Sequence, residues 1–238
     1  MTVKAFEVGG IVRDDIIGVK SNDVDYTVTA PSFEDMRQFV IDNGMKIVVE
    51  TPEFYTIRAV ARESFQGRKG GLDFVWAREE GPYSDGRRPD WVKPGTLFMD
   101  QQRRDFTMNA IAKDADGSLI DPFNGQADIR DRIISAVGDP MERLTEDALR
   151  AVRAVRFAVT KNFAIEPTLA RALQSRKVLR AIEEDISDER IQVELSKMFR
   201  FDTIHSIWIL SKFPRLTEAM FAGSVSLDAT MKTKGRGA

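Results

Sequence analysis

The stretch that decides the fold is KAFEVGGIVRDDIIGVKSNDVDYTVT, residues 4–29. Its apolar and β-branched residues predict one strand at residues 3–8 and another at residues 24–29. Between them a glycine pair leads into a short helix, residues 11–18, that ends in a glycine of its own. A strand, a Gly-Gly turn, a helix and a second strand in so short a stretch predict a compact site at one end of a sheet.

Two aspartates mark the start of the second strand. Asp23 and Asp25 are two residues apart, so on a strand their side chains project from the same face, while Val24 and Tyr26 face the core. Two carboxylates at that distance repel each other unless a cation lies between them. A hard divalent ion, Mg²⁺ or Mn²⁺, is the cation that carboxylates favour. Nucleotide transfer uses such ions to activate a hydroxyl and to hold a triphosphate.

A third carboxylate would complete a metal-binding catalytic site. Asp73 is the candidate, because it alternates with large apolar residues on a strand, residues 72–77, that could pair beside the first. An Asp-x-Asp taken alone also fits a solvated strand start.

The glycine pair favours phosphate binding. Gly9 and Gly10 let the backbone approach phosphate oxygens, and the following helix offers unpaired N–H groups to an anion. Arg13 adds a fork of donors suited to phosphate. The alternative is a plain strand–turn–helix corner.

Composition excludes several classes of chemistry. The chain has 238 residues, 42% hydrophobic, with a net charge of −2, no cysteine and one histidine, His205. Disulfides, thiolate metal sites and histidine-based triads are therefore excluded or improbable. The N-terminus lacks an apolar signal core, and the apolar run at residues 207–210 is too short to span a bilayer. We expect no membrane partner and a cytoplasmic location.

The chain changes character midway, which predicts an α+β protein. A helix at residues 32–43, capped by Ser32, and strands at 45–51 and 54–60 precede a glycine-rich turn at 67–71. Residues 79–95 are rich in Gly, Pro and charge and predict a long mobile loop. Helical spacing then follows at residues 106–112, 141–161, 166–182 and 188–199. We expect domains at residues 1–135 and 136–228, joined within 121–139, and an unfolded tail at 229–238.

The motifs, taken in order, resemble those of one family. GGIVRD (9–14) and DVD (23–25) are followed by RRDFTMNA (103–110), DPFNG (121–125), EDALR (146–150) with Arg153, Arg156 and Phe157, and ER (189–190) with Glu194. This series is similar to that of the class II, bacterial-type CCA-adding tRNA nucleotidyltransferases and the related bacterial poly(A) polymerases. The resemblance covers about residues 5–200.

The resemblance implies a fold and an activity. The fold would be a polymerase-beta-like nucleotidyltransferase head with a mixed sheet, then an all-α neck and a short body. The reaction would be addition of CTP and ATP to the tRNA 3′ end, with Asp23 and Asp25 holding the metal and Asp73 joining them in catalysis. The family places sugar recognition and the head-to-neck connection around Arg104 and Asp105. Asp105 could also simply cap the helix that carries Asn109 one turn on.

In the family the aspartate and arginine of the EDALR motif pair with the incoming base. They correspond to Asp147 and Arg150, which would share one helix face and offer an acceptor beside fork donors. The motif extends to Arg153 and Arg156. An intrahelical ion pair between Asp147 and Arg150 is the alternative.

Residues 150–180 carry a local excess of positive charge. Arg150, Arg153, Arg156, Lys161, Arg171, Arg176, Lys177 and Arg180 face one acid, Glu166. Contact with a triphosphate or an RNA backbone would explain this excess, and a solvated helix face is the alternative. Few residues follow the last motif, so we expect a shortened C-terminal body.

The sequence leaves related activities open. CC addition, A addition or poly(A) synthesis would use the same motifs, and a catalytically inactive RNA-binding homologue is a further alternative that intact Asp23 and Asp25 disfavour. A dinucleotide-binding enzyme is a weaker one, because no G-x-G-x-x-G follows the first strand. The oligomeric state is not determined.

Overall fold

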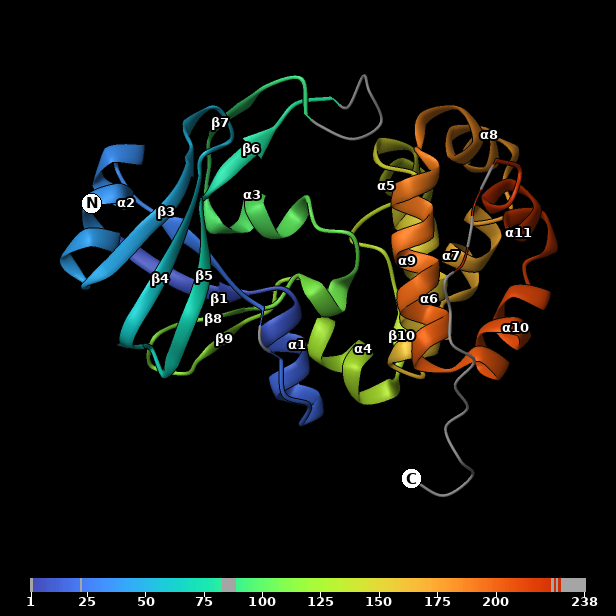
Figure 1. Cartoon of the computed structure of the whole chain (residues 1–238), viewed down its shortest axis with the longest axis horizontal. Coiled ribbons are helices and arrows are strands. Elements are labelled where there is room, and N and C mark those ends of the chain that lie inside the picture. Colours follow the sequence, from blue (N-terminus) through green and yellow to red (C-terminus); the bar gives the residue numbers. More distant parts are fainter. Residues whose placement is uncertain (1, 22, 83–88, 224, 226, 228–238) are drawn as a thin grey trace. The chain divides into compact units, whose positions relative to one another are not determined.

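A computed structural model describes residues 2–21, 23–82, 89–223, 225 and 227. The chain divides into two compact units, one of Met1–Gly81 and Asp90–Ile129, the other of Pro82–Pro89 and Arg130–Ala238. The first contains the main sheet and the second is largely helical (Figure 1). The predicted α+β class is confirmed.

The first unit is built on a seven-stranded mixed sheet of order β3-β4-β5-β2-β1-β8-β9. Its strands are β1 (Lys4–Val8), β2 (Val24–Thr29), β3 (Met45–Thr51), β4 (Thr56–Phe65), β5 (Arg68–Trp76), β8 (Ala112–Lys113) and β9 (Leu119–Ile120). β2 and β5 run parallel, and the other neighbours run antiparallel. β2 is thus central, with β1 on one side and β5 on the other.

The opening stretch folds as predicted. β1 leads into α1 (Gly10–Ile17), which is closed by Gly18, and β2 has the predicted bounds. α2 (Phe33–Asp42) begins after Ser32, whose hydroxyl accepts a hydrogen bond from the backbone N–H of Asp35. Local capping and hydrophobic alternation decide these elements, because each signal lies within a few residues of the structure it specifies.

One face of the sheet carries the core of this unit. The ring of Tyr26 stacks on Phe74 with centroids 5.0 Å apart, and Phe65 meets Tyr26 edge-on at 5.2 Å. Met36 and Val40 of α2 are fully buried. The opposite face is left for polar chemistry, because residues alternate between the two faces along each strand.

Two predictions for the first unit are wrong. The glycine-rich segment 67–71 is not a wide turn, because β4 and β5 continue into it and only a tight turn at Gln66 and Gly67 joins them. The segment 79–95 is not wholly a loop either. β6 (Arg78–Glu80) pairs antiparallel with β7 (Val92–Pro94), so both of its ends are paired strands. Residues 83–88 lie outside the described residues.

The helix predicted at residues 106–112 is also wrong. Those residues form a 3-10 turn, η2 (Thr107–Asn109), and then enter β8. The helix of this region is instead α3 (Leu97–Gln102), six residues capped by Thr96. Phe106, Met108 and Ile111 are fully buried, so the apolar spacing that predicts a helix here reflects tertiary burial.

The DPFNG turn has a specific structure. Both carboxylate oxygens of Asp121 accept backbone N–H groups, from Gly125 and Gln126, each at 2.8 Å, and so cap α4 (Gly125–Asp131). A Cβ at Gly125 would lie 2.2 Å from the carbonyl oxygen of Thr107. Only glycine fits against η2.

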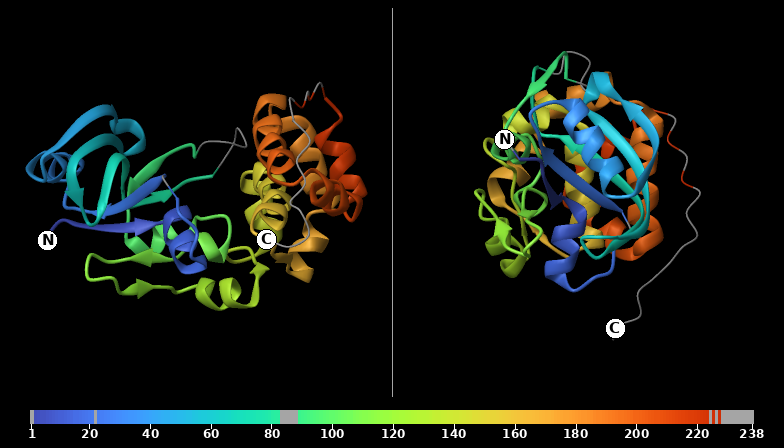
Figure 2. Two further views of the ribbon diagram at one scale, coloured as in Figure 1. Left: turned by 60° about the horizontal axis from the view of Figure 1, so that its bottom comes forward. Right: turned by 90° about the vertical axis from the view of Figure 1, so that its left-hand side faces the viewer.

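The helical unit contains more breaks than predicted. Its helices are α5 (Pro140–Glu146), α6 (Leu149–Thr160), α7 (Pro167–Ala172), α8 (Arg176–Asp185), α9 (Asp188–Phe201), α10 (Thr203–Ser211) and α11 (Pro214–Met220). A two-strand pair of β10 (Ile133–Ile134) and β11 (Ala164–Ile165) accompanies them. The helices of this unit have the yellow to red colours in Figure 2. The helix predicted over 141–161 breaks at Asp147, and the one over 166–182 breaks at 173–175.

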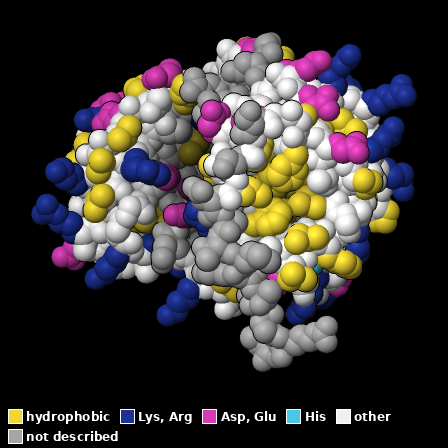
Figure 3. All heavy atoms as spheres, turned by 45° about the vertical axis from the view of Figure 1, so that its right-hand side comes forward, with side chains coloured by type: hydrophobic (Ala, Val, Ile, Leu, Met, Phe, Trp, Pro, Cys, Tyr) yellow, Lys and Arg dark blue, Asp and Glu magenta, His cyan; other side chains and the backbone are white. Residues whose placement is uncertain are grey.

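The second unit packs around α6, which buries most of its residues and contacts α9 and α10. On α10 the side chains of Ile204, Ile207 and Trp208 are each more than half exposed. Hydrophobic side chains gather on the face of this unit seen in Figure 3. The tail expected at 229–238 lies outside the described residues. No described helix has the length and apolar character needed to cross a membrane.

Replacing Gly125 tests the close packing of α4 on η2. Because the new methyl group would overlap the Thr107 carbonyl, Gly125→Ala should destabilise the protein by about 2 kcal/mol. The measurement is urea unfolding followed by circular dichroism. Gly71→Ala is the control, since a Cβ there meets nothing within 4 Å. Equal midpoints for the two variants would contradict this packing.

Candidate active site

The central acids lie on two adjacent parallel strands. Asp25 on β2 is directly opposite Asp73 on β5, so the two carboxylates share one face of the sheet. Val24 and Tyr26 are buried, as the alternation predicts. Asp23 precedes β2 and is exposed. The structure thus places Asp73 beside the predicted pair.

Electrostatics make Asp25 the focus of this group. Burial raises the pKa of its carboxyl above the ordinary value, and the negative charges of Asp73 and Asp23 raise it further. The positive charges of Arg104 and Arg58 act in the opposite direction. A carboxyl that is disfavoured as an anion by burial and by its neighbours is typical of sites that hold a cation during function.

Arg58 is a residue of this site that the sequence reasoning missed. Its guanidinium donates two hydrogen bonds to the Asp73 carboxylate, Nε to Oδ1 and Nη2 to Oδ2, each at 2.6 Å. Both oxygens of Asp73 are therefore engaged. The signal in the sequence was weak, because Arg58 is one of several polar residues that alternate along β4 and only the β4–β5 register pairs it with Asp73.

The described residues contain no group of three or more His, Cys, Asp and Glu side chains that could hold a metal ion. With Asp73 tied to Arg58, two acids remain, Asp23 and Asp25, the pair that the sequence predicts. Their carboxylate oxygens are ligands that a hard divalent ion prefers, and such an ion would offset the repulsion between Asp25 and its acidic neighbours.

Gly9 occupies the tightest point of the site. Its φ of 74° is disfavoured for other residues, and a Cβ there would lie 2.9 Å from Nη1 of Arg104 and 3.8 Å from Oδ2 of Asp25. The glycine turn, the central aspartate and Arg104 are thus in close proximity. Gly10 begins α1, where backbone N–H groups are unpaired.

Asp100 anchors the arginines of the RRDF motif and was also missed. Its side chain is fully buried on α3 and binds Nη2 of Arg103 at 2.5 Å, Nη2 of Arg104 at 3.0 Å and the hydroxyl of Thr27 at 2.8 Å. Burial alone would raise the pKa of Asp100, but the two arginines and Thr27 hold it far below its usual range. The i,i+3 and i,i+4 spacing to the two arginines was the available signal.

Three predicted nucleotide-binding residues form one chain of hydrogen bonds. Nη1 of Arg13 donates to Oδ1 of Asn109 at 2.6 Å, and Nδ2 of Asn109 donates to Oδ1 of Asp105 at 2.8 Å. Arg13 is 6% exposed and also binds Asp14. In this structure Arg13 joins α1 to η2, so it supports the glycine turn from behind. Asp105 accepts a hydrogen bond from the N–H of Phe106, and the segment that follows is the 3-10 turn η2, not the helix that Asp105 was expected to cap.

A second buried charge group holds β1 in place on the other face of the sheet. Glu7 is 1% exposed and binds Nε of Arg68 at 2.7 Å and Nζ of Lys113 at 2.6 Å. Both cations also bind Asp15 of α1. Burial would raise the pKa of Glu7, but these partners lower it. The group fixes both sides of the Gly9 turn.

In the helical unit, the predicted arrangement of Asp147 and Arg150 is wrong. Asp147 is extended, in the break between α5 and α6, and does not share a helix with Arg150. Its carboxylate binds Nη2 of Arg190, with Oδ2 at 3.3 Å, and Oδ1 accepts the N–H of Leu149. Arg150 donates to Glu146 at 2.7 Å and to the carbonyl of Arg143. Arg150 thus pairs with Glu146 across the break between α5 and α6. The alternative of an Asp147–Arg150 pair within one helix is wrong as well, because the two residues do not lie in one helix.

Arg190 is a further polar group that the sequence reasoning did not single out as a site residue. Its Nη1 is buried and has no hydrogen-bond partner, while Nη2 holds Asp147. A buried donor without a partner is costly unless a ligand or water satisfies it. The sequence signal was present, because Arg190 belongs to the last motif.

Arg153 and Arg156 gather around Phe157 and Glu194. The Arg156 guanidinium lies 3.8 Å from the Phe157 ring centroid and binds Glu194, while that of Arg153 lies 5.4 Å from the ring. Burial would raise the pKa of Glu194, but Arg156, Arg153 and Lys197 keep it below its usual value. The cations of residues 150–180 therefore fall into two groups. The α6 arginines are held within the unit, and Arg171, Arg176, Lys177 and Arg180 are exposed.

A mixed sheet with facing carboxylates beside a glycine turn is the arrangement of a nucleotidyltransferase head. Residues 5–135 match the family model of the Poly A polymerase head domain. The chain belongs to this family of nucleotidyltransferases, as its motifs predict.

Curated and solved relatives agree with this assignment. The CCA-adding enzyme of Levilactobacillus brevis is 42% identical over 82% of this chain and 46% of its own length. The Bacillus stearothermophilus CCA-adding enzyme in complex with CTP is similar over 88% of this chain and 48% of that one, with a TM-score of 0.73 and 32% identity. A tRNA nucleotidyltransferase complexed with a primer tRNA and an incoming ATP analogue is similar over 93% of this chain and 60% of that one, with a TM-score of 0.75 and 29% identity. The chain spans about half the length of the curated relatives it matches.

Asp100→Asn tests the buried anchor. Removing the charge leaves Arg103 and Arg104 without their shared counter-ion. The free energy of unfolding of the variant at pH 7 should therefore be about 3 kcal/mol lower than that of the unaltered protein. Because the folded-state pKa of Asp100 is depressed, its stabilisation is complete above the unfolded carboxyl pKa of about 3.9 and declines as pH falls below it. Urea unfolding between pH 7 and pH 3 should show that the difference in free energy of unfolding between the unaltered protein and Asp100→Asn becomes smaller below about pH 4. A gap independent of pH would contradict the ion-pair role.

Proposed function

We propose that this protein is a template-independent tRNA nucleotidyltransferase that adds CCA to tRNA 3′ ends from CTP and ATP and releases pyrophosphate. The observation that carries the proposal is the convergence of Asp25, Asp73 and Gly9 at the centre of the sheet. Acids beside a phosphate-compatible turn match the needs of nucleotidyl transfer, which depends on positioning and charge stabilisation. The relatives named CCA-adding enzyme support the choice of RNA and nucleotides.

Asp23 and Asp25 would hold Mg²⁺ or Mn²⁺, with Asp73 as the third catalytic carboxylate once Arg58 releases it. The ion supplies Lewis-acid stabilisation of the triphosphate and activation of the attacking hydroxyl. The N–H groups after Gly9 and Gly10 would receive phosphate oxygens, with Arg13 supporting the turn. Arg104 lies close to Gly9 and is held by Asp100 at 3.0 Å. It would stabilise the negative charge of the phosphate oxygens bound at this turn.

Sugar and base recognition fall to two different groups. Asp105 and Asn109, already joined by a hydrogen bond, would bind the ribose of the incoming nucleotide. Asp147 and Arg150 would read the base edge, and the free Nη1 of Arg190 supplies a further donor beside Asp147. Arg153 and Arg156 would order this region through Phe157.

The remaining features fit an RNA substrate. The exposed cations of α7 and α8, Arg171, Arg176, Lys177 and Arg180, would contact the tRNA backbone. In this scheme residues 1–135 form the catalytic head and residues 136–228 the neck and body. Because tRNA and nucleoside triphosphates are the substrates, we place the activity in the cytoplasm.

Asp25→Asn tests the catalytic assignment. Loss of the central charge should lower nucleotide addition at least about 100-fold at any Mg²⁺ concentration, because the ion loses its buried ligand. The assay supplies a tRNA lacking its last three nucleotides with CTP, ATP or both, and reads the 3′ ends. Asp42→Asn, an exposed change on α2, is the control. Full activity of Asp25→Asn would remove Asp25 from catalysis.

Asp147→Asn tests base reading. Exchanging an acceptor for a donor should reduce the preference for CTP over UTP, measured as the ratio of kcat/KM values, by about tenfold or more. The Mg²⁺ dependence should stay unchanged, since Asp147 is assigned no metal. Glu142→Gln on the exposed face of α5 is the matched control. Unaltered nucleotide choice in Asp147→Asn would reject the role.

A further inference from the structure

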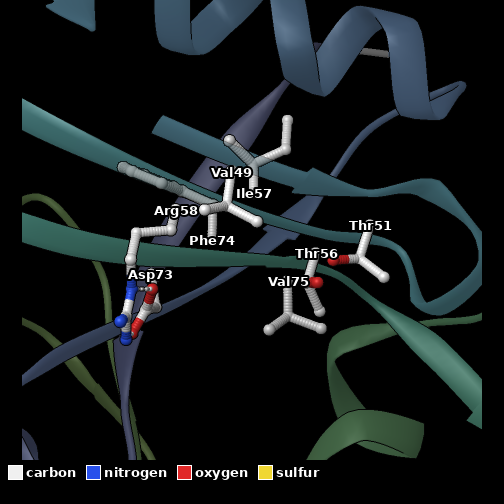
Figure 4. A pocket seen from close by; sticks show the side chains of 8 residues that line it. All are labelled: Val49, Thr51, Thr56, Ile57, Arg58, Asp73, Phe74 and Val75. Atoms are coloured by element: carbon white, nitrogen blue, oxygen red, sulfur yellow. Dashed lines mark hydrogen bonds and ion pairs between the residues drawn. The ribbon is translucent and has the colours of Figure 1, made fainter. Parts of the chain in front are cut away.

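An open pocket lies beside the acids, on the same face of the sheet. It has a volume of about 320 Å³, and its lining comes from β3, β4 and β5 (Figure 4). The strand register explains it. Arg58 is opposite Asp73 and Val49, and Thr56 is opposite Val75 and Thr51. The pocket therefore begins at the Arg58–Asp73 ion pair and continues over apolar and hydroxyl side chains.

The proposed function gives this side of the site a defined occupant. β2 separates β1, which ends at the Gly9 turn, from β5, which carries Asp73. In phosphoryl transfer the attacking and leaving oxygens lie roughly in line with the phosphorus. If the triphosphate lies at Gly9, the attacking 3′ hydroxyl must arrive from the Asp73 side. The end of the RNA then lies over β5 and β4, where the pocket opens.

The chemistry of the pocket suits one nucleotide. Val49, which is 53% exposed, and Val75 offer apolar contact to a base, and the hydroxyls of Thr51 and Thr56 offer hydrogen bonds. The side chain of Arg58 is 64% exposed, although it is paired with Asp73. An exposed arginine can exchange a carboxylate for a phosphate with the same fork geometry. That exchange would also release the oxygens of Asp73.

We propose that this pocket receives the 3′-terminal nucleotide of the RNA primer, with its base against Val49 and Val75 and its phosphate on Arg58. The inference rests on the proposed function and adds where the primer end is bound. Arg58 is a positioning residue in this scheme, since it acts on the primer and on Asp73 without touching the reacting atoms.

Primer binding without nucleoside triphosphate tests the phosphate contact. Arg58→Met should weaken binding of a tRNA that lacks its last nucleotide about fivefold, and should reduce the slope of log Kd against log salt by about one. Arg62→Met is the matched control, an exposed arginine of the same strand that does not line the pocket. A slope equal to that of the control would overturn the contact.

A primer without its terminal base tests the pocket itself. Val49→Trp fills the pocket and should weaken binding of the intact primer about fivefold, but should leave binding of a primer with an abasic terminal nucleotide unchanged. Val48→Trp, exposed on the same strand but outside the lining, is the control. Equal losses on both primers, or none on either, would overturn the base site. Extension of the same tRNA by the unaltered protein is measured in parallel. If it proceeds while both variants bind like their controls, the pocket assignment fails and the proposed function stands.

Discussion

The parallel pairing of β2 with β5 is the constraint on which the site depends. It sets Asp25 opposite Asp73 on one face of the sheet, where burial and the negative charges of Asp73 and Asp23 raise the pKa of the Asp25 carboxyl. Arginines offset this cost from two directions, Arg58 from β4 and Arg104 from the end of α3. A compact group of acids at the centre of a sheet persists because cations from neighbouring elements are fixed close to it.

Fixing those cations requires a second layer of charge. Asp100, fully buried, holds Arg103 and Arg104, and Glu7 on the opposite face holds Arg68 and Lys113. A buried ion pair adds little net stability, but breaking one is costly, so such groups favour a single arrangement of the elements they join. In this protein the elements joined are those that place the Gly9 turn. Positioning of the site is thus the main consequence of these pairs.

In the helical unit, a break between α5 and α6 positions the side chain of Asp147. The break at Asp147 turns its carboxylate toward Arg190 on α9, which a continuous helix through residues 141–161 would not do. Arg190 keeps one buried donor without a partner. In the proposed function, this donor and the Asp147 carboxylate acceptor would both form hydrogen bonds with the edge of the incoming base. The break in the helix would then be the feature on which nucleotide selection depends.

The sequence by itself determined the opening strand–turn–helix–strand, the α+β class and the family, because these depend on patterns and motifs that lie within short stretches of the chain. The catalytic roles of Asp23, Asp25 and Asp73 stay predictions. The sequence predicted a helix at residues 106–112, because the buried residues of the 3-10 turn there have helical apolar spacing. It also predicted one helix where α5 and α6 are separate, because the break at Asp147 leaves the apolar spacing unchanged. The contact of Arg58 with Asp73 and that of Asp147 with Arg190 were decided only by the tertiary structure, because strand register sets the first and packing between helices sets the second. Asp100 had a local signal in its spacing to Arg103 and Arg104, but only the tertiary structure buries it.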